Sequence, residues 1–443
     1  MSQPEISSPL GRESGAGQPS LGPAERGQPM GQPQKSQPPI SQPPIGQPRM
    51  GQPAMGQSNA LVGAHLAVSS SRARAYERAL SELLAAADVR LDGSRPWDIR
   101  VNDERLFQRV LGHGSLGAGE AYMDGWWDCA QLDEMLTRVL RSNIEEHLRS
   151  PRAVKLALSA RLFNKQSSRR AYIVGEKHYD LGDDLYELML DPRMIYSCAY
   201  FERATQLNDA QEAKLDLVAR KIGAQAGMRI LDIGCGWGGA AQFMAQRYGA
   251  AVTGVTVSRN QLQTAQKRCA GLDVDIRLED YRSLTGRSFD AIYSLGMFEH
   301  VGVRNYRTYL AKARELLRPN GLFLLHTIGN NHSSVATDPW IDKYIFPNGQ
   351  LPSLAQISKA AEGLWVIEDF HSFGVYYDRT LLAWSENFER AWPKLSARYS
   401  ERFRRMWHFW LMSSAASFRA RKTQLWQIVL SPTGVAGGYR AVR

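Results

Sequence analysis

Four residues in the middle of the chain are spaced for binding a small-molecule cofactor. Asp232 lies in an apolar stretch, and Gly234, Gly236 and Gly238 follow it at alternate positions. Because glycine has no side chain, the backbone can approach a ligand closely here, and a helix that starts at this point would offer free N–H donors. A dinucleotide site would instead have Gly-x-Gly-x-x-Gly and an acid about twenty residues further on. The sequence therefore disfavours NAD.

Four polar side chains near the ends of the next two predicted strands could complete this site. No carboxylate ends the second strand, so Thr256 and Gln261 are the nearest groups able to hydrogen-bond a ribose. Asp280 follows the third strand, where it could accept a hydrogen bond from an adenine amine, and Tyr281 beside it could stack on the base. Asp280 could equally cap a helix, and the residues alone leave both alternatives open.

Glu299 and His326 fall at the predicted carboxyl ends of the fourth and fifth strands, where open α/β sheets bind ligands. His326 and Tyr377 could donate hydrogen bonds to an anion, whereas an ionised Glu299 could only accept one. Taken singly, each of these residues also has a structural explanation. Glu299 could cap a helix, His326 could be a satisfied core histidine, and Tyr377 could be a packed aromatic. Cys198 could be a small buried hydrophobe.

These residues need a sheet to position them, and the hydrophobic pattern from Met228 onward predicts one. Helices are expected between the strands, notably Asn260–Ala270 and Tyr306–Leu317, the latter closed by Arg318-Pro319-Asn320-Gly321. Alternation of short strands with helices predicts a Rossmann-like α/β fold with a doubly wound, mostly parallel sheet of seven strands. The predicted strands are Met228–Ile233, Ala251–Val257, Val274–Leu278, Phe289–Leu295, Leu322–Ile328, Trp365–Phe370 and Leu425–Leu430.

The chain divides into four predicted parts. Residues 1–69 form a Gln/Pro-rich tail that we expect to be disordered, because proline removes backbone donors and few large apolar groups are present. Residues 70–147 are expected to form a small, mainly helical N-terminal domain, and residues 148–177 a basic linker. Residues 178–443 then form the domain that carries the cofactor site.

The N-terminal domain has a mixed pattern. Helical spacing predicts helices over Arg74–Ala87 and around Arg105–Leu111, with a short strand at Trp97–Val101 between them. A glycine-spaced stretch, Gly114–Glu120, follows, and then an aromatic block, Tyr122–Trp127. Composition alone interprets that block as a packing core under a turn.

Composition sets limits on partners and location. The formal net charge of +10 indicates an anionic partner, either nucleic acid or a membrane with acidic lipids. No apolar run is long enough to span a bilayer and no secretory signal is recognisable, so we expect a cytoplasmic protein. The cysteines are too scattered for a disulfide framework or a metal site, so reduced thiols and no metal are expected at Cys129, Cys198, Cys235 and Cys269.

Two basic segments with interleaved apolar residues could lie at a membrane surface. Residues 151–177 and residues 401–422 each combine several Arg and Lys side chains with large apolar ones. Such segments can place their cations on lipid phosphates and their aromatic rings at headgroup level. Each could equally be a helix packed on the protein with a solvated basic side. Both alternatives stay open for both segments.

The Asp-x-Gly-x-Gly-x-Gly spacing resembles the first motif of S-adenosylmethionine-dependent methyltransferases. Longer strings resemble, specifically, the cyclopropane-fatty-acyl-phospholipid synthases of the mycolic acid cyclopropane synthase-like superfamily. The resemblance runs from about Tyr76 almost to the end, and the Gln/Pro-rich tail has no counterpart in it. The strings are His178–Gly182, Tyr196–Tyr200, Met297–Gly302, His326–Gly329, Trp340–Gly349 and Phe373–Asp378, joined by Gly114–Glu120 and Tyr122–Trp127.

The resemblance implies a class I methyltransferase fold and a specific reaction. A cis double bond in a phospholipid acyl chain attacks the methyl of S-adenosylmethionine, a carbocation forms, and the ring closes after a proton leaves the new methyl. A bicarbonate ion beside the sulfonium accepts that proton. By position, the bicarbonate would be held by Cys198, Glu299, His326, the backbone of Ile328, and Tyr377. The implied cofactor contacts are Tyr196, Ser197, Asp232, Gly234, Gly236, Trp237, Gly238, Thr256, Gln261, Asp280 and Tyr281.

The same resemblance implies partners and leaves competing products open. It implies a phospholipid bilayer surface as partner, attachment to the inner face of the membrane, a homodimer, and a role for the N-terminal domain in lipid binding or dimerisation. The same carbocation could give a methyl-branched or methylene product. A nucleic-acid methyltransferase is disfavoured, because Gly296-Met297-Phe298-Glu299 stands where an Asn/Asp-Pro-Pro-aromatic motif would bind a flipped base. A noncatalytic lipid-binding relative would normally lack one of the four candidate side chains, and all four are present.

Overall fold

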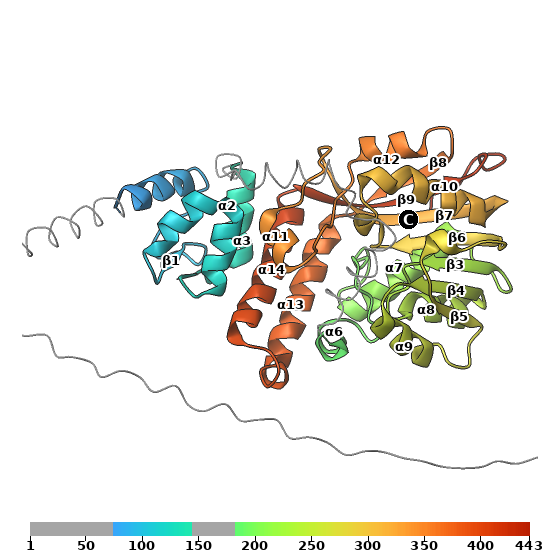
Figure 1. Cartoon of the computed structure of the whole chain (residues 1–443), viewed down its shortest axis with the longest axis horizontal. Helices are drawn as coiled ribbons and strands as arrows, with labels where there is room; N and C mark the ends of the chain where they lie inside the picture. Colours follow the sequence, from blue (N-terminus) through green and yellow to red (C-terminus); the bar gives the residue numbers. More distant parts are fainter. Residues whose placement is uncertain (1–73, 144–181) are drawn as a thin grey trace, which may run out of the picture. The chain divides into compact units, whose positions relative to one another are not determined.

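The computed structural model describes residues 74–143 and 182–443 (Figure 1). The predicted tail (1–69), the basic linker (148–177) and residues 178–181 lie outside the described residues, as do the predicted boundaries between these parts. The string His178–Gly182 is described only at its last residue.

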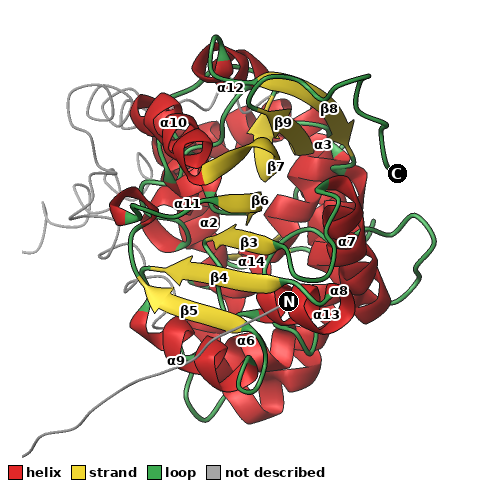
Figure 2. Ribbon diagram, turned by 90° about the vertical axis from the view of Figure 1, so that its right-hand side faces the viewer, coloured by secondary structure: helices red, strands yellow, loops and turns green. Residues whose placement is uncertain are grey.

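A seven-stranded sheet forms the centre of residues 182–443 (Figure 2). Its order is β5-β4-β3-β6-β7-β9-β8, and β9 alone runs opposite to the direction of the other six strands. The order reverses between β3 and β6, the kind of position at which open α/β sheets bind ligands. This confirms the predicted Rossmann-like, mostly parallel sheet. The strands are β3 (Arg229–Ile233), β4 (Ala251–Thr256), β5 (Val274–Leu278), β6 (Phe289–Leu295), β7 (Leu317–Asn330), β8 (Val366–Ser372) and β9 (Thr423–Ser431).

Helices cover both faces of the sheet because strand side chains alternate between the faces. On one face, Ile230 and Leu324 are fully buried in a cluster with residues of α7 (Leu207–Lys221) and α8 (Gly239–Tyr248). On the other face, Leu231 and Phe323 are fully buried with residues of α10 and α12. The remaining helices of this part are α6 (Asp183–Met189), α9 (Arg259–Arg268), α10 (Tyr306–Leu316), α11 (Pro339–Tyr344), α12 (Leu354–Ala361), α13 (Val375–Leu395) and α14 (Glu401–Arg419).

The largest difference between predicted and observed strand bounds lies at the start of β7. The segment Arg318-Pro319-Asn320-Gly321, predicted to close a helix, belongs to β7, and α10 ends at Leu316. The pairing of β7 with β6 shifts between Phe289 and Ala291, opposite this segment. An irregularity of this kind lets a strand accommodate a proline, which cannot donate to the ladder.

The described part of the N-terminal domain is mainly helical, as predicted. Residues 74–85 form a helix, followed by β1 (Arg100–Val101), α2 (Arg105–Met123), β2 (Trp127–Asp128) and α3 (Leu132–Arg141). The glycine-spaced stretch was wrongly separated from the preceding helix, because α2 continues through it with a kink at Gly114 (φ 57°, ψ −135°). Close packing explains a glycine within this helix, since a Cβ at Gly119 would lie 2.5 Å from Trp340 Nε1. Tyr122 and Trp127 are buried, so the interpretation of the aromatic block as a packing core is confirmed.

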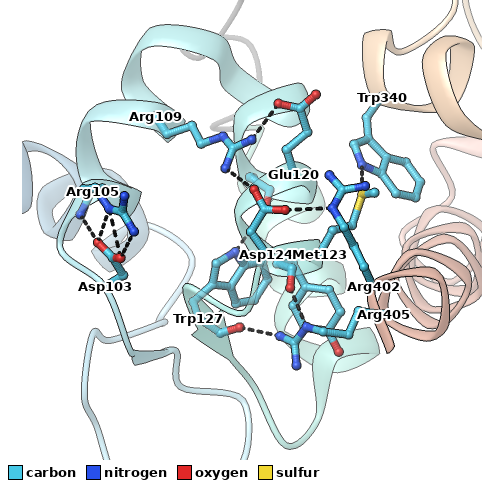
Figure 3. A network of polar contacts seen from close by, with 12 residues as sticks. Asp103, Arg105, Arg109, Glu120, Met123, Asp124, Trp127, Trp340, Arg402 and Arg405 are labelled. Atoms are coloured by element: carbon cyan, nitrogen blue, oxygen red, sulfur yellow. Dashed lines mark hydrogen bonds and ion pairs between the residues drawn. The ribbon is translucent and has the colours of Figure 1, made fainter. Parts of the chain in front are cut away.

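Charged side chains link this domain to α14 (Figure 3). Arg402 Nε donates to Asp124 Oδ1 at 2.9 Å, and Arg405 Nη2 donates to Asp128 Oδ1 at 2.8 Å. Asp124 also accepts from Arg109 Nη1 at 2.7 Å. We call Arg109, Glu120, Asp124, Asp128, Lys343, Arg402 and Arg405 the α2–α14 network.

The same contacts decide between the two interpretations of residues 401–422. Trp407, Phe409, Trp410 and Phe418 are buried, and Arg419 pairs with Asp133 and Asp378. Most of the segment is therefore a helix packed on the protein, and these four aromatic residues are not available at a membrane surface. No helix in residues 74–143 or 182–443 combines the length and the apolar character needed to cross a bilayer.

Candidate functional site

The glycine turn joins β3 to α8 and forms one wall of a cavity. The N–H groups of Gly234 and Cys235 both donate to Val255 O at 3.0 Å, which holds the turn against β4. Gly236 has a φ of 53°, and a Cβ built there would meet no atom within 4 Å. The turn is therefore a cradle in which the backbone itself can contact a ligand.

The cavity has a volume of about 190 Å³ and opens at the carboxyl ends of β3, β4, β5 and β6. Gly238 is not among its lining residues; it is the left-handed N-cap of α8. Every other predicted cofactor contact lines the cavity: Tyr196, Ser197, Asp232, Gly234, Gly236, Trp237, Thr256, Gln261, Asp280 and Tyr281.

The polar residues at the β4 and β5 ends are held by local hydrogen bonds. Thr256 Oγ1 donates to Gln261 Oε1 at 2.9 Å. Asp280 accepts from the backbone N–H of Arg282 at 3.0 Å and from its Nε at 2.8 Å. Asp280 therefore caps the short 3-10 helix η2 (Tyr281–Ser283), which confirms the capping alternative. Asp280 also lines the cavity.

Asp183 fastens the turn to α9, a role that sequence analysis missed. Trp237 Nε1 donates to Asp183 Oδ1 at 2.9 Å, and Asn260 Nδ2 donates to the same oxygen at 2.8 Å. Thr264 donates to Oδ2 at 2.6 Å. The one available signal was that Asp183 directly follows the string His178–Gly182.

Two buried carboxyl groups at the strand ends have raised pKa values. Burial raises the pKa of Asp232 to about 7, against the effect of the hydrogen bond from the Tyr293 hydroxyl at 2.9 Å. Burial also raises the pKa of Glu299 to about 7, against the effect of the Ile328 N–H, which donates to Glu299 Oε1 at 2.6 Å. Glu299 Oε2 has no hydrogen-bond partner among the described residues. Raised carboxyl pKa values of this kind are typical of functional sites.

His326 is fully buried on β7 and is neutral. Burial, with the positive charges of Lys214 and Lys221, lowers its pKa well below the ordinary value. Its Nδ1 lies 3.3 Å from Gln427 Nε2, whereas its Nε2 has no partner in the part of the chain that the structure describes. If the amide donates to Nδ1, the imidazole proton is on Nε2, which is then a free donor.

Cys198 and Tyr377 come from separate segments and belong to one large hydrophobic cluster, against which Ile328 packs. Ala199 N donates to Thr380 Oγ1 at 3.1 Å, which ties the segment of Cys198 to α13 one turn after Tyr377. The Cys198 thiol is buried against the carbonyl of Ala199 at 3.2 Å, and burial raises its pKa, so it stays protonated.

None of these residues lines the cavity, although chain neighbours of some of them do. Gly296, a lining residue, donates its N–H to His326 O at 2.9 Å. Ser197 lines the cavity directly before Cys198 in the chain, and Met297 and His300 line it on either side of Glu299. The structure thus brings Glu299 and the Ile328 backbone together beside the cavity, with His326 two residues before Ile328 on β7, and it places Cys198 and Tyr377 in one hydrophobic cluster.

Sequence analysis missed several further residues of the site. Glu279, Met297 and His300 also line the cavity, and burial lowers the pKa of His300 to about 4. Gln211 and Lys214 on α7 are fully buried behind Ser197. His300 could have been found from its place directly after Glu299. No signal marks Gln211 and Lys214, because two polar residues three apart on a helix are usually exposed to solvent.

Comparison with known proteins identifies the family. The sequence model of one protein family, described as mycolic acid cyclopropane synthetase, matches residues 166–428. The chain is 53% identical over 371 residues to the cyclopropane-fatty-acyl-phospholipid synthase of Escherichia coli K12, covering 83% of this chain and 96% of that protein. The chain belongs to the mycolic acid cyclopropane synthetase family. This membership confirms the family predicted from the sequence strings.

Other family members extend the comparison. Tuberculostearic acid methyltransferase of Mycobacterium tuberculosis is 34% identical, over 75% of this chain and 82% of that protein. A crystal structure of a mycolic acid cyclopropane synthase in complex with SAH and CTAB superposes with a TM-score of 0.55 at 32% identity, covering 58% of this chain and 97% of that chain. The predicted S-adenosylmethionine-dependent enzyme with a class I methyltransferase fold is thereby confirmed.

Proposed function

We propose that this protein is a cyclopropane-fatty-acyl-phospholipid synthase, which transfers a methylene group from S-adenosylmethionine to the cis double bond of an unsaturated phospholipid acyl chain. One observation carries the proposal within the family. Beside the cavity, Glu299 Oε2 and His326 Nε2 are buried and lack a partner among the described residues. Buried polar atoms are normally hydrogen-bonded, so these two atoms point to a further ligand next to the cofactor.

The cavity residues fit S-adenosylmethionine. The open space at Gly236 allows close approach of a ligand to the backbone, and Tyr281 offers a ring on which adenine would stack. Thr256 and Gln261 would meet the ribose, and Tyr196 and Ser197 the methionine end. When bound, the cofactor supplies an electrophilic methyl group on a positively charged sulfur.

Aromatic side chains supply the environment that a carbocation requires. The Tyr196 ring lies 5.3 Å from that of Trp384 and 6.1 Å from that of Trp410, and the Tyr377 and Trp384 rings are 6.0 Å apart. Aromatic faces attract a cation through their quadrupoles, and a tightly packed cluster keeps water away from it. Because an alkene is a poor nucleophile, holding it in line with the methyl would account for about 7–11 kcal/mol of the barrier.

A bicarbonate ion fits the two atoms that are unpaired among the described residues, Glu299 Oε2 and His326 Nε2. His326 Nε2 would donate to it, as would the protonated thiol of Cys198 and the hydroxyl of Tyr377. Because the Ile328 N–H occupies Glu299 Oε1, a protonated Glu299 would carry its proton on Oε2, and an ionised Glu299 would accept the proton of the bicarbonate there. Bicarbonate held in this place would supply the base for the proton that leaves the new methyl carbon.

We also infer that the protein acts at the surface of a phospholipid bilayer. The formal net charge of +10 supports this inference, because anionic lipids attract basic proteins. A homodimer, and attachment to the inner face of the membrane, belong to the proposal on the strength of the family resemblance.

A second product is possible from the same site. The methyltransferase named for tuberculostearic acid is 34% identical to this chain. The carbocation that leads to a ring could instead lose a proton from a chain carbon to give a methyl-branched alkene, or lose a methyl proton after a hydride shift to give a methylene chain. The proposal favours the cyclopropane because the relative with the higher identity is named a cyclopropane synthase.

Product analysis tests the proposal. Purified protein, S-adenosylmethionine and vesicles of unsaturated phospholipid should yield acyl chains that are heavier by one carbon and two hydrogens in a lipid mass spectrum. Proton NMR should then show strongly shielded ring protons and no new vinylic or branched methyl signal. An unchanged mass spectrum, with an active reference enzyme in parallel, would reject the catalytic proposal, and a branched methyl signal would replace the cyclopropane by the second product.

A further inference from the structure

Helix α7 carries a row of polar side chains that face the protein interior. Gln211, Lys214 and Lys221 are all fully buried, at spacings of three and seven residues that place them on one face. Buried lysines are uncommon, because desolvating an ammonium group is expensive unless a partner compensates for it. The two lysines differ in what compensates for them.

Lys221 has the partners of a structural lysine. Its Nζ lies 3.4 Å from Asp369 Oδ2 and 3.1 Å from His371 Nδ1. Asp369 is also bound by Arg443 at 2.6 and 2.8 Å. None of these residues lines the cofactor cavity.

Lys214 has a different environment. Its Nζ donates to Ser197 Oγ at 2.7 Å, and within the described ranges no carboxylate lies within salt-bridge distance of it. Three residues further back, Gln211 Nε2 donates to Ser197 O at 2.8 Å. Two side chains of α7 thus hold the hydroxyl and the carbonyl oxygen of one cavity residue.

The hydrogen bond from Lys214 determines the direction of the Ser197 hydroxyl. An ammonium group can only donate, so Ser197 Oγ is the acceptor in this contact. The hydroxyl proton of Ser197 must then point away from Lys214. Ser197 lines the cofactor cavity, so that proton is available to a ligand there.

We propose that Lys214 is a positioning residue, which fixes the Ser197 hydroxyl as a donor to an anionic oxygen of the ligand in the cavity. The inference rests on the proposed function, because that function supplies two such oxygens. One belongs to the carboxylate of the methionine part of the cofactor, and the other to bicarbonate. Both are carboxylate-type oxygens, and a charge-assisted hydrogen bond suits either.

The charge on Lys214 also bears on its neighbours. The titratable groups that face it are Asp191 before the Tyr196 segment, Cys198 in that segment, Asp232 on β3 and His326 on β7. Burial lowers the pKa of Lys214 to about 8, against the opposite effect of Asp191, Cys198 and Asp232. When Lys214 loses its proton, the neutral amine can accept from Ser197, and the hydroxyl is free to turn away from the cavity.

Calorimetric titration with two nucleosides tests the inference. S-adenosylhomocysteine contains the amino-acid carboxylate, whereas 5′-methylthioadenosine lacks it. If Ser197 binds that carboxylate, Lys214→Met should weaken binding of S-adenosylhomocysteine about tenfold and leave binding of 5′-methylthioadenosine unchanged, as expected for loss of a hydrogen bond to a charged group. If Ser197 binds bicarbonate, both nucleosides should bind as in the wild type, and the bicarbonate concentration for half-maximal rate should rise about tenfold.

Lys221→Met is the matched control, because it removes an equally buried lysine from the same helix and leaves Arg443 on Asp369. It should bind both nucleosides and use bicarbonate as the wild type does. Adding Ser197→Ala to Lys214→Met should cause no further loss, because the two residues act through one hydrogen bond. Wild-type binding and wild-type bicarbonate use by a folded Lys214→Met variant would overturn the inference, as would losses from the two substitutions that simply add.

The unmutated protein gives an independent test if Lys214→Met fails to fold. Binding of whichever anion Ser197 contacts, S-adenosylhomocysteine or bicarbonate, should weaken as the pH rises through about 8. This pH dependence should disappear in Ser197→Ala. The same pH dependence in Ser197→Ala would contradict the inference. Wild-type protein that binds S-adenosylhomocysteine but leaves lipid unchanged would sink the proposed function and not the role of Lys214.

Discussion

Two polar regions of this protein differ in how their carboxyl groups are compensated. In the α2–α14 network, each carboxylate faces at least one arginine or lysine. Although partial burial opposes it, contacts with Lys343 and Arg109 lower the pKa of Glu120 to about 2. At the carboxyl edge of the sheet, Glu299 has no cationic partner among the described residues, and burial raises its pKa to about 7.

The comparison shows what separates a structural network from a ligand site. Both regions contain acids, and neither could be told from the other by residue type. The network satisfies its own charges and holds two parts of the chain together. The sheet edge leaves Glu299 Oε2 and His326 Nε2 buried without a partner in the described chain, which is costly unless a ligand supplies one.

Glu299→Gln should give the largest effect, on the rate of lipid modification. The substitution keeps the shape of the side chain but removes the group that titrates, so we expect the rate to fall about a hundredfold or more. Binding of S-adenosylhomocysteine should be unchanged, since Glu299 does not line the cavity. Rate assays and calorimetry on the same preparation measure both; a variant with nearly wild-type turnover would remove Glu299 from the chemistry.

The same substitution should change the pH dependence of stability. The pKa of Glu299 is raised in the folded protein, so its contribution is fully present below about pH 4.5 and is lost as the pH rises through about 7. The free energy of unfolding of Glu299→Gln, relative to that of the wild type, should therefore be higher at pH 8 than at pH 5 by about 2.5 kcal/mol. Denaturant unfolding of both proteins at the two pH values measures this difference. If the difference in unfolding free energy between variant and wild type were the same at both pH values, the pKa of Glu299 would not be raised in the folded protein.

Glu120→Gln should have the opposite sign and a smaller size. The pKa of Glu120 is lowered in the folded protein, so its contribution is present above about pH 4.5 and is lost as the pH falls through about 2. We expect the variant to lose about 1–2 kcal/mol of unfolding free energy at pH 7 because partly exposed pairs are partly screened. The rate per folded molecule should stay at the wild-type level. Greater stability in the variant would erase the contrast between the two regions.

Much of the fold was predictable from the sequence because strand patterns are local. The stretches Val274–Leu278 and Phe289–Leu295 were predicted with the bounds that the structure has, since the first alternates apolar and charged residues, the second is mostly apolar, and turn residues flank both. The kinked helix α2 was not, because one of its glycines, Gly119, is explained by a distant partner, Trp340. Residues 401–422 were ambiguous for the same reason, since their carboxylate partners lie in other segments.

The candidate site was predictable where its residues lie at strand ends or in the sequence stretches that resemble the family. The cofactor residues gathered around one cavity because parallel strands end at one edge of the sheet. Lys214 and Gln211 could not be found in this way, because only the packing of α7 against Ser197 reveals that they are buried. The pairing of Asp280 with Arg282 likewise depends on the conformation of η2.

The dependence of the rate on bicarbonate tests the central claim most directly. The claim is that Glu299 Oε2 and His326 Nε2 are buried to hold an anion that the chain does not supply. The rate of lipid modification by the wild type should fall when dissolved carbonate is removed by degassing in an inert atmosphere, and should return when bicarbonate is added back. Glu299→Gln should respond weakly to the same addition. A wild-type rate that is unaltered by carbonate depletion would contradict the account.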